Sequence, residues 1–362
     1  MLVTAVEARP LRNLEQVRIE LGAGIISLIG PNGAGKTNLL EALYFALTGR
    51  SFRTADRRDL IPFGASFARA QATVRDGDVE RVLLASVSRA EGRRHLLDGS
   101  PADPATMARN RPPVAVFSPD RLALIKGPPG ERRAHLDRFV AARWPARGDL
   151  RRRFGQALAQ RNALLARLAG SQLGAAELDV WDAALAEAAA ALIAARTEAV
   201  GELASPFAAA AAELGFEGEA RLEYAPRAAG SAGEIREGLA ARREDDLRLG
   251  RSSWGPHLDE LKIALAGRPL RRYGSQGQQR AALLALLFAE RDALLQGRGA
   301  APLLLLDDVM SELDPGRREL LVERLGAGGQ ALVTAAAEES VPRQAMGCAV
   351  RMPLAAAHAA AA

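Results

Sequence analysis

Residues 25–43 read IISLIGPNGAGKTNLLEAL: an apolar run, a glycine-rich turn and a second apolar segment with helical spacing. The turn at residues 30–37 fits the pattern G-x-x-x-x-G-K-[ST], and a buried strand before it and a helix after it are the context that this pattern requires. The glycines let the backbone curl around phosphate groups, which the helix N-terminus also faces. The sequence therefore predicts a strand at 25–29, a phosphate-binding loop and a helix from about 36 to 47. A purely structural glycine turn is the alternative.

The loop supplies the candidate nucleotide contacts. Lys36 is expected to reach the terminal phosphates of ATP, and the Thr37 hydroxyl is expected to ligate Mg²⁺. Only three of the 48 basic residues are lysines. A lysine here is informative, because a compact ammonium and a planar guanidinium are not interchangeable where geometry is tight. The predicted nucleotide contacts from this segment are Gly30, Pro31, Asn32, Gly33, Ala34, Gly35, Lys36, Thr37 and Asn38.

A second anchor for magnesium is expected at the end of another buried strand. Residues 303–308 read LLLLDD, an apolar strand that ends in two acids. We expect Asp307 to hold the metal, directly or through water, as in other phosphate-binding-loop ATPases. Asp308 then lies where a carboxylate orients or deprotonates the attacking water. Two acids that merely cap the following turn are the alternative.

A third motif opens a later helix. Residues 273–280 read YGSQGQQR, and a helix that begins with Ser275 beside glycines presents free N–H groups to an anion. An ordinary N-cap explains this segment when it is taken alone. The LLLLDD strand and then SELD at 311–314 follow it, however. Signature helix, Walker B strand and D-loop occur in this order in ABC-type ATPases.

The remaining pattern divides the chain into three segments. Strands are expected at 2–8, 15–21, within 67–98, and at 114–117, 261–265, 302–306 and 330–334, with a helix at 277–296 and another at 315–326. Residues 148–170 and 176–213 are typical of long helices. The predicted fold is α/β: an ABC-type P-loop ATPase head assembled from residues 1–129 and 251–362, with a helical insertion domain at 130–250. No role is predicted for the alanine-rich tail after Pro353.

Composition restricts the protein class only broadly. The net charge of +5 and the pI of about 9.9 permit binding to a polyanion. No apolar run approaches the roughly 18 residues that a membrane-spanning helix needs, and the N-terminus lacks a signal-peptide apolar block. Cys348 is the only cysteine, which excludes an intrachain disulfide. We therefore expect a cytoplasmic protein with no membrane partner.

Seven stretches resemble motifs of the RecF family of bacterial DNA replication and repair ATPases. They run from about residue 11 to 322 and read LRNLEQ, GPNGAGKTNLLEAL, GRSFRTADRRDLI, VFSPDRLALIKGPPGERRAHLDR, GPHLDEL, GSQGQQR and LLLLDDVMSELDPGRRELL. The Walker elements alone fit any ABC-type repair ATPase, whereas FSPDRLALIKG, GPH and SQGQQR in series are more specific.

The resemblance implies a mechanism and partners. It implies an ATP-dependent homodimer in which Ser275, Gly277 and Gln278 of one subunit complete the ATP site of the other. It further implies slow, DNA-stimulated hydrolysis, binding to single-stranded and gapped DNA, and cooperation with RecR and RecO in loading RecA during recombinational repair and the SOS response. Leu258 and Glu260 depart from the Arg and Asp expected there, which puts phosphate or DNA contacts from these positions in doubt.

Two arginine clusters are candidate DNA contacts, and a plain solvated surface is the alternative for each. The first is Arg53, Arg57 and Arg58, and the second is Arg132, Arg133 and Arg138. Aromatic residues are only 4%, so recognition by backbone and shape is expected. His257 of the GPH motif is either a turn histidine or a functional one.

Three rival classes make demands that can be checked against the sequence. A structural chromosome ATPase of the SMC class needs long heptad arms, and residues 130–249 are too short and too poor in heptads. A transporter ATPase needs a switch histidine, and none follows Thr334 at that position. A nucleotide-binding protein without hydrolysis fits if Asp308 does not face the attacking water.

Overall fold

The computed structural model describes residues 1–168, 175–299, 301–342, 345 and 349–352, and these divide into two compact units. Unit 1 comprises Met1–Arg121 and Leu294–Ala362, and unit 2 is Leu122–Ala293. The head is thus built from both ends of the chain. These boundaries differ from those expected at 129/130 and 250/251, because residues 251–293 pack with the helical region. The three-segment assignment by function remains a prediction.

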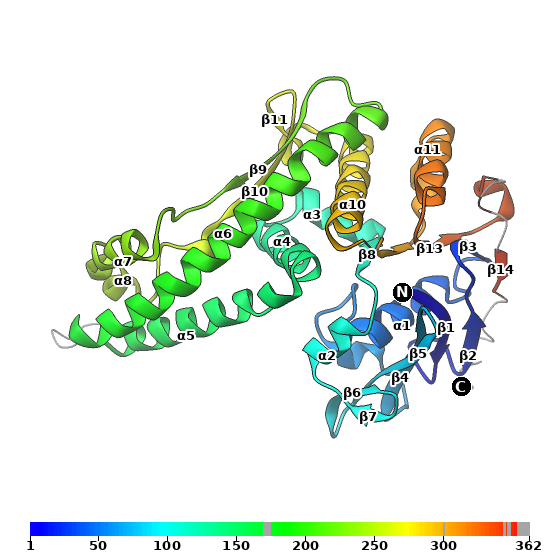
Figure 1. The fold of residues 1–362 in the computed structure, drawn as a ribbon, viewed down its shortest axis with the longest axis horizontal. Helices are drawn as coiled ribbons and strands as arrows, with labels where there is room; N and C mark the ends of the chain where they lie inside the picture. The colour runs from blue at the N-terminus through cyan, green and yellow to red at the C-terminus, as the bar shows by residue number, and fades with distance from the viewer. Residues whose placement is uncertain (169–174, 300, 343–344, 346–348, 353–362) are drawn as a thin grey trace, which may run out of the picture. The chain divides into compact units, whose positions relative to one another are not determined.

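Unit 1 contains two sheets (Figure 1). The first is antiparallel with strand order β2-β1-β4-β5-β6-β7. Its strands are β1 (Leu2–Ala8), β2 (Val17–Glu20), β4 (Phe67–Asp76), β5 (Val79–Ser88), β6 (Gly92–Leu97) and β7 (Ser100–Pro101). The second is parallel with order β14-β3-β13-β12-β8. Its strands are β3 (Gly24–Ile29), β8 (Val114–Phe117), β12 (Leu303–Leu306), β13 (Gln330–Ala335) and β14 (Ala349–Arg351).

The parallel sheet brings the predicted motifs of unit 1 to one edge. β12 pairs in register with β13, and β13 pairs with β3, so the strands that precede residues 30 and 307 end on the same side. Every residue of β12 and β13 is buried, as expected of strands covered on both faces. The helices of this unit are α1 (Lys36–Thr48), α2 (Pro104–Arg109) and α11 (Pro315–Gly326).

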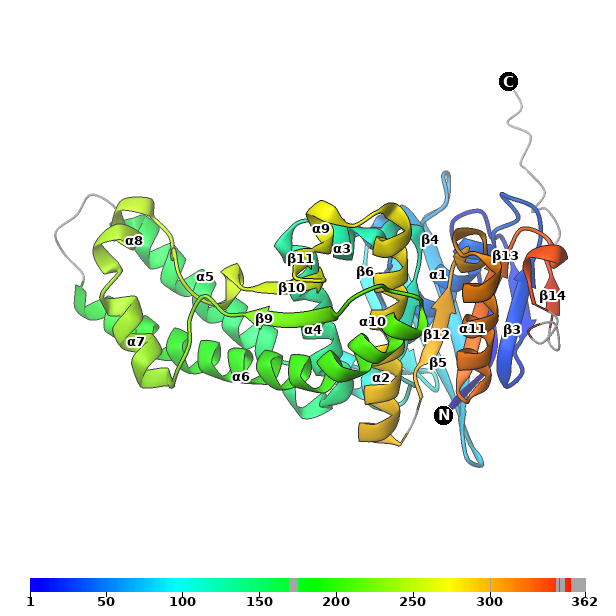
Figure 2. The same cartoon turned by 90° about the horizontal axis from the view of Figure 1, so that it is seen from above.

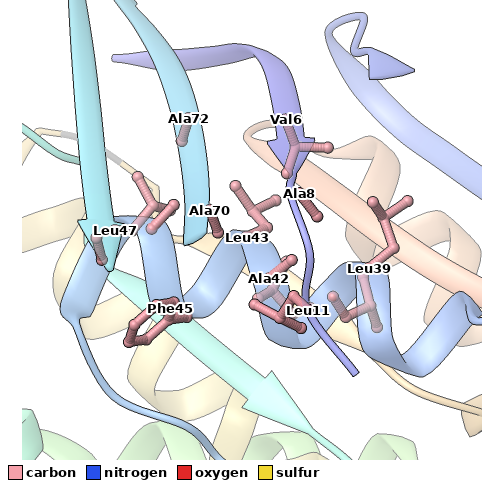
Figure 3. Close-up of a cluster of buried hydrophobic side chains, with 14 of the residues drawn as sticks. Val6, Ala8, Leu11, Leu39, Ala42, Leu43, Phe45, Leu47, Ala70 and Ala72 are labelled. Carbon is pink, nitrogen blue, oxygen red and sulfur yellow. The ribbon is translucent and has the colours of Figure 1, made fainter. Parts of the chain in front are cut away.

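Helix α1 forms the centre of the unit 1 core. Leu39, Leu43 and Leu47 recur at a spacing of four and are fully buried. In Figure 3, Leu43 and Leu47 lie beside Ala70 and Ala72 of β4, whose small side chains let the helix approach the antiparallel sheet closely, and Leu39 lies nearer Ala8 of β1. Buried residues of the parallel sheet belong to the same core, so helix α1 packs between the two sheets.

Unit 2 is mainly helical, but it contains a small sheet, of which the sequence predicted only the strand at 261–265. The helices are α3 (Ala123–Lys126), α4 (Pro129–Arg143), α5 (Leu150–Leu168), α6 (Ala175–Glu213), α7 (Ala232–Ala240), α8 (Arg243–Leu249), α9 (Leu270–Tyr273) and α10 (Gln276–Arg298), of which α10 continues into unit 1. β9 (Ala220–Ala225) pairs antiparallel with β10 (Glu260–Leu265), which also pairs with β11 (Arg268–Pro269). Buried and exposed residues alternate at the start of β9, so the signal was present inside a region read as helical.

The two long helices predicted at 148–170 and 176–213 are confirmed as α5 and α6, which lie side by side (Figures 1 and 2). A buried ion pair fixes their pairing: Arg161 of α5 bonds Asp182 of α6 at 2.6 Å and Asp246 of α8 at 2.6 Å. All three side chains are fully buried. Removal of one partner would leave an uncompensated buried charge, at a cost of about 3–5 kcal/mol.

Candidate nucleotide-binding site

The loop between β3 and α1 has the backbone that close approach to phosphates requires. Gly33 and Gly35 adopt the left-handed region with φ of 85° and 90°, where other residues are strained. A side chain at Gly30 would place its Cβ 2.5 Å from the carbonyl oxygen of Met352, so only glycine fits there. No side chain caps the N-terminus of α1, which leaves N–H groups of the first turn available to an anion.

A pocket of about 250 Å³ lies over this loop. Its lining brings together the predicted Walker A and Walker B residues and several residues that were not predicted as nucleotide contacts. The lining residues are Asn13, Asn32, Gly33, Gly35, Lys36, Thr37, Asn38, Arg53, Asp307, Asp308, Thr334 and Ala336. All of them belong to unit 1.

Lys36 lies inside the curl of the loop. Its Nζ donates to the carbonyl oxygens of Gly30 at 2.6 Å and Pro31 at 2.9 Å. Partial burial lowers its pKa, an effect opposed by the charges of Asp308 and Asp307. These two hydrogen bonds hold the ammonium group at the phosphate-binding loop, where it could contact a terminal phosphate of a nucleotide.

Thr37 and Asp307 face each other at the edge of the parallel sheet. The Thr37 hydroxyl donates to Asp307 Oδ1 at 2.7 Å, and the hydroxyl of Thr334, at the end of β13, donates to the same oxygen at 3.0 Å. Asp307 is 7% exposed, and burial raises its pKa, against the opposing effect of these two hydrogen bonds. A hydroxyl and a carboxylate oxygen fit a hard cation such as Mg²⁺, and a cation here would hold the carboxylate ionised.

Asp308 has a strained backbone and an exposed side chain. Its φ of 51° lies in the left-handed region, which a non-glycine residue adopts at a cost, and its N–H donates to the Thr334 hydroxyl at 2.8 Å. The carboxylate lines the pocket beside Asp307. The turn at Asp308 therefore points one acid to the metal-binding position and leaves the next acid free in the pocket.

A chain of amides and one arginine closes another side of the pocket. Asn13 Nδ2 donates to the Gly33 carbonyl at 3.1 Å, Asn38 Nδ2 donates to Asn13 Oδ1 at 2.6 Å, and Arg53 Nη1 donates to Asn38 Oδ1 at 2.9 Å. Asn13 lies in the LRNLEQ stretch, which carried family resemblance but no predicted role. Arg53, predicted as a DNA contact, lines this pocket, and its role towards DNA remains a prediction.

Glu41 supports this side of the pocket from within the core. Its carboxylate is fully buried and accepts hydrogen bonds from Arg12 at 2.9 and 3.1 Å and from the Ser51 hydroxyl. Arg53 lies 3.6 Å from the same carboxylate. The segment after α1 is thereby tied back to the first turns of the helix. Sequence analysis did not predict this network, although Glu41 lies among the apolar residues of α1 and could have indicated it.

The signature segment lies in unit 2 and has the predicted capped geometry. The Ser275 hydroxyl accepts from the Gln278 N–H at 3.2 Å, and Gln278 Oε1 accepts from the Ser275 N–H at 2.8 Å. This reciprocal capping begins α10, as expected. Ser275 and Gly277 are exposed, and space is open around Gly277. Gln278 uses its side-chain oxygen in the cap.

The second arginine cluster has structural partners in unit 2. Arg132 is 4% exposed, pairs with Glu260 at 2.6 Å, and also donates to the Gly127 carbonyl at 2.9 Å. Arg133 donates to the Asp259 carbonyl at 2.8 Å. Arg132 thus uses its donors within the unit, whereas Arg133 uses Nη1, and DNA contacts from these arginines remain a prediction. The pairing of Arg132 also explains why an acid at position 260 suits this chain.

The GPH motif is packed into the same unit. His257 Nε2 lies 3.2 Å from the Ser252 carbonyl oxygen, and its ring stacks on Phe154 with a centroid separation of 6.1 Å. Burial lowers the pKa of His257. Asp259 accepts from Arg196 at 2.9 Å and from the Arg227 N–H at 2.8 Å. These contacts join α6 to the β9–β10 sheet, and they give the histidine a packing role.

In the first cluster, Arg57 and Arg58 behave differently. Arg57 donates from Nε to the Gly49 carbonyl at 2.9 Å, at the C-terminus of α1. Arg58 is exposed and pairs with Asp56 at 2.7 Å, which holds the pKa of that carboxyl at about 2. Neither residue lines the nucleotide pocket.

The fold and the site together define an ATP-binding head of the ABC and SMC class. The family model described as RecF/RecN/SMC N terminal domain matches residues 2–354. Solved structures include an SMC head bound to the C-winged helix domain of ScpA, with a TM-score of 0.54 and 18% identity over 93% of this chain and 90% of that one, a likeness in fold alone.

The chain belongs to the RecF family. It is 36% identical to the DNA replication and repair protein RecF of Streptomyces avermitilis over 94% of this chain and 95% of the relative. It is 39% identical to the RecF of Anaeromyxobacter sp. strain Fw109-5 over 90% of each. The structure of the recombination mediator protein RecF-ATP in the RecFOR pathway matches with a TM-score of 0.83 and 28% identity, covering 94% of each chain.

These matches confirm the predicted family, the ABC-type α/β head with an inserted helical region, and the class of ATP-binding ATPase. The family's named role is DNA replication and repair. No helix within the described part of the chain combines the length and the apolar character that crossing a membrane demands.

Proposed function

We propose that the protein is a slow, DNA-stimulated ATPase that dimerises on ATP, binds single-stranded and gapped DNA and helps to load a recombinase at gaps. The observation that carries the proposal is the convergence of Lys36, Thr37, Asp307 and Asp308 on one pocket. The family's named role in DNA replication and repair, and the RecFOR pathway named for the matching structure, support the choice of partners: RecR and RecO, acting on RecA.

Each site residue has a distinct role in this proposal. The first-turn N–H groups of α1 and Lys36 bind the phosphates, and Thr37 and Asp307 hold Mg²⁺. When bound, Mg²⁺ would neutralise charge at the transferred phosphoryl group. Asp308 accepts a proton from, or orients, the attacking water. The two hydroxyls on Asp307 Oδ1 position that carboxylate before the cation arrives.

The dimer is proposed from the exposed signature segment. Ser275 and Gly277 present the N-terminus of α10 to solvent, and a helix N-terminus with an open glycine suits a phosphate. ATP held by the loop of one subunit would be completed by this segment of the second. Hydrolysis then removes the γ-phosphate that joins the two, which opens the dimer.

Two measurements on one preparation test the proposal. Sedimentation with and without ATP should show a nucleotide-dependent dimer. Phosphate release should be slow alone and faster with gapped DNA than with blunt duplex. A chain that stays monomeric with ATP and releases phosphate at the same rate with and without DNA would be a nucleotide-binding protein of another function.

A further inference from the structure

Three arginine side chains and a buried histidine gather at the C-terminus of α1, which is the end of that helix away from the phosphate-binding loop. We call this group the Arg93 cluster: Arg50, Arg57, Arg93 and His95. The α1 helix has 13 residues, so the two ends lie about 20 Å apart. The Arg93 cluster is therefore separate from the nucleotide pocket, and its residues do not line that pocket.

The antiparallel sheet explains how the cluster assembles. Arg93 and His95 alternate along β6 and pair with Val87 and Ala85 of β5, so they lie on the face of the sheet that packs against α1. The His95 ring lies directly on the end of α1, since a Cβ at Gly49 would be 1.8 Å from its Nε2. Arg57 reaches the same point through its bond to the Gly49 carbonyl.

The charge of Arg57 acts on the nearby Asp56 carboxylate, but Asp56 forms its ion pair with Arg58. Within the described residues, neither Arg50, Arg57 nor Arg93 forms an ion pair, although most arginines near them do. Arg50 and Arg57 are close enough to lower the pKa of Arg93, after the larger effect of its partial burial. His95 is 8% exposed, and its Nε2 is buried without a hydrogen-bond partner in the described part of the structure.

A structural explanation accounts for only one of the three arginines. Cations are favoured at a helix C-terminus, and Arg57 occupies that position. Arg50 and Arg93 are exposed and have no such acceptor among the described residues. Neighbouring positive charges repel one another, and a bound anion would relieve this repulsion. A guanidinium group can bind a phosphate through two parallel hydrogen bonds.

We propose that Arg50, Arg57 and Arg93 form a binding site for a backbone phosphate of DNA, with the His95 ring as its buried floor. The inference rests on the proposed DNA-binding function and adds a location to it. Three neighbouring guanidinium groups suit a phosphodiester, which carries one charge and no base identity, so the contact is independent of sequence. Arg57 was already predicted as a DNA contact, and the proposed site adds Arg50 and Arg93 to it.

The experiment compares two double variants of the full-length protein. Arg50→Gln with Arg93→Gln removes two cations from the cluster. Arg75→Gln with Arg94→Gln is the matched control, because both arginines are exposed and lie on the opposite face of the same sheet. Affinity for gapped DNA is measured over a salt series, with ATP affinity as the test of folding. The cluster variant should bind DNA roughly tenfold more weakly, with a salt slope lower by about two.

A second readout reports on the cluster directly. Arg93 and Arg57 contribute to holding the pKa of His95 at about 4, beside the larger effect of burial, so a phosphate bound between them should raise it. The NMR resonance of the His95 ring is assigned by comparison with His95→Gln. It is then followed over a pH titration in the presence of a short duplex, of inorganic phosphate, or of neither. The duplex should move the titration midpoint up by about one unit.

The outcomes separate the two hypotheses. If wild-type protein does not bind gapped DNA, both the proposed function and this site are wrong. If wild type binds and the two double variants bind equally, only the site is wrong. If inorganic phosphate moves the His95 midpoint and the duplex does not, the cluster takes a small anion, and the DNA assignment is overturned.

Discussion

Thr37 and Asp307 are 270 positions apart in the chain, yet the Thr37 hydroxyl donates a 2.7 Å hydrogen bond to Asp307 Oδ1. The two residues proposed to hold magnesium thus already face each other. Thr334 fixes the same carboxylate oxygen from a third strand. The site is therefore organised by the parallel sheet, before any ligand contributes.

Lys36→Ala should weaken ATP binding by roughly 10- to 100-fold, because the site loses a charge-assisted bond to phosphate. Lys36→Arg should be similarly defective, because two carbonyl oxygens at 2.6 and 2.9 Å surround Nζ and leave little room for a planar guanidinium. Equilibrium titration with a fluorescent ATP analogue measures both. Wild-type affinity in Lys36→Ala would remove the lysine from the site.

Asp308→Asn keeps the shape of the side chain and removes its charge. ATP and magnesium should still bind, whereas turnover should fall by about a hundredfold or more, since a general base typically contributes that much. The variant should then accumulate as an ATP-bound dimer with a longer residence time on gapped DNA. Unchanged turnover and unchanged residence, measured on the same folded preparation, would mean that another residue activates the water.

Ser275→Arg should leave nucleotide binding by the monomer intact and prevent the ATP-dependent dimer. The physical reason is that an exposed helix N-terminus would be covered by a bulky cation at the point where the partner's phosphate must enter. Sedimentation velocity with ATP reports the dimer. Ser275→Ala serves as the control that removes the hydroxyl cap without the bulk. Normal dimers in the arginine variant would refute the proposed role of the signature segment.

Arg53→Gln tests whether this arginine serves nucleotide or DNA. It lines the pocket and bonds Asn38, so its loss should weaken ATP binding by roughly two- to fivefold, a typical exposed charge effect. Arg58→Gln is the matched control, because Arg58 lies in the same segment, outside the pocket. Equal ATP affinities in the two variants, with weaker DNA binding in Arg53→Gln alone, would mean that Arg53 serves DNA and not the nucleotide.

The stability of the protein should depend on His95 in mildly acidic solution. Its pKa is lowered from 6.5 to about 4 in the folded chain, by burial first and then by the charges of Arg93 and Arg57. Between these values the unfolded chain binds more protons, so this contribution is complete above about pH 6.5 and is lost as the pH falls towards 4. The free energy of unfolding should fall by up to about 3 kcal/mol across this range. Denaturant unfolding of wild type and of His95→Gln at several pH values tests this prediction. If the free energy of unfolding depended on pH in the same way in both proteins, His95 would not be the cause.

Much of the local structure could be predicted because its causes are local. The strand at 24–29, the helix beginning at Lys36 and the cap at Ser275 follow from apolar spacing, glycine freedom and side-chain capping within a few residues. The β9 strand was missed because six residues with an alternating pattern lie in a region whose composition favours helices. The domain boundaries were placed from composition, whereas packing assigns residues 251–293 to the helical unit.

The sequence by itself determined that the protein binds a nucleotide, because a phosphate loop needs only its own glycines, lysine and hydroxyl in strand-to-helix context. Only the tertiary structure decided what surrounds each arginine. Arg53 lies on the nucleotide pocket, Arg132 pairs with an acid 128 positions away, and Arg93 joins an unpaired cationic cluster. The physical reason is that the role of a charged side chain depends on its neighbours and on its burial. The fold brings those neighbours together from distant parts of the sequence, so a local sequence pattern cannot predict them.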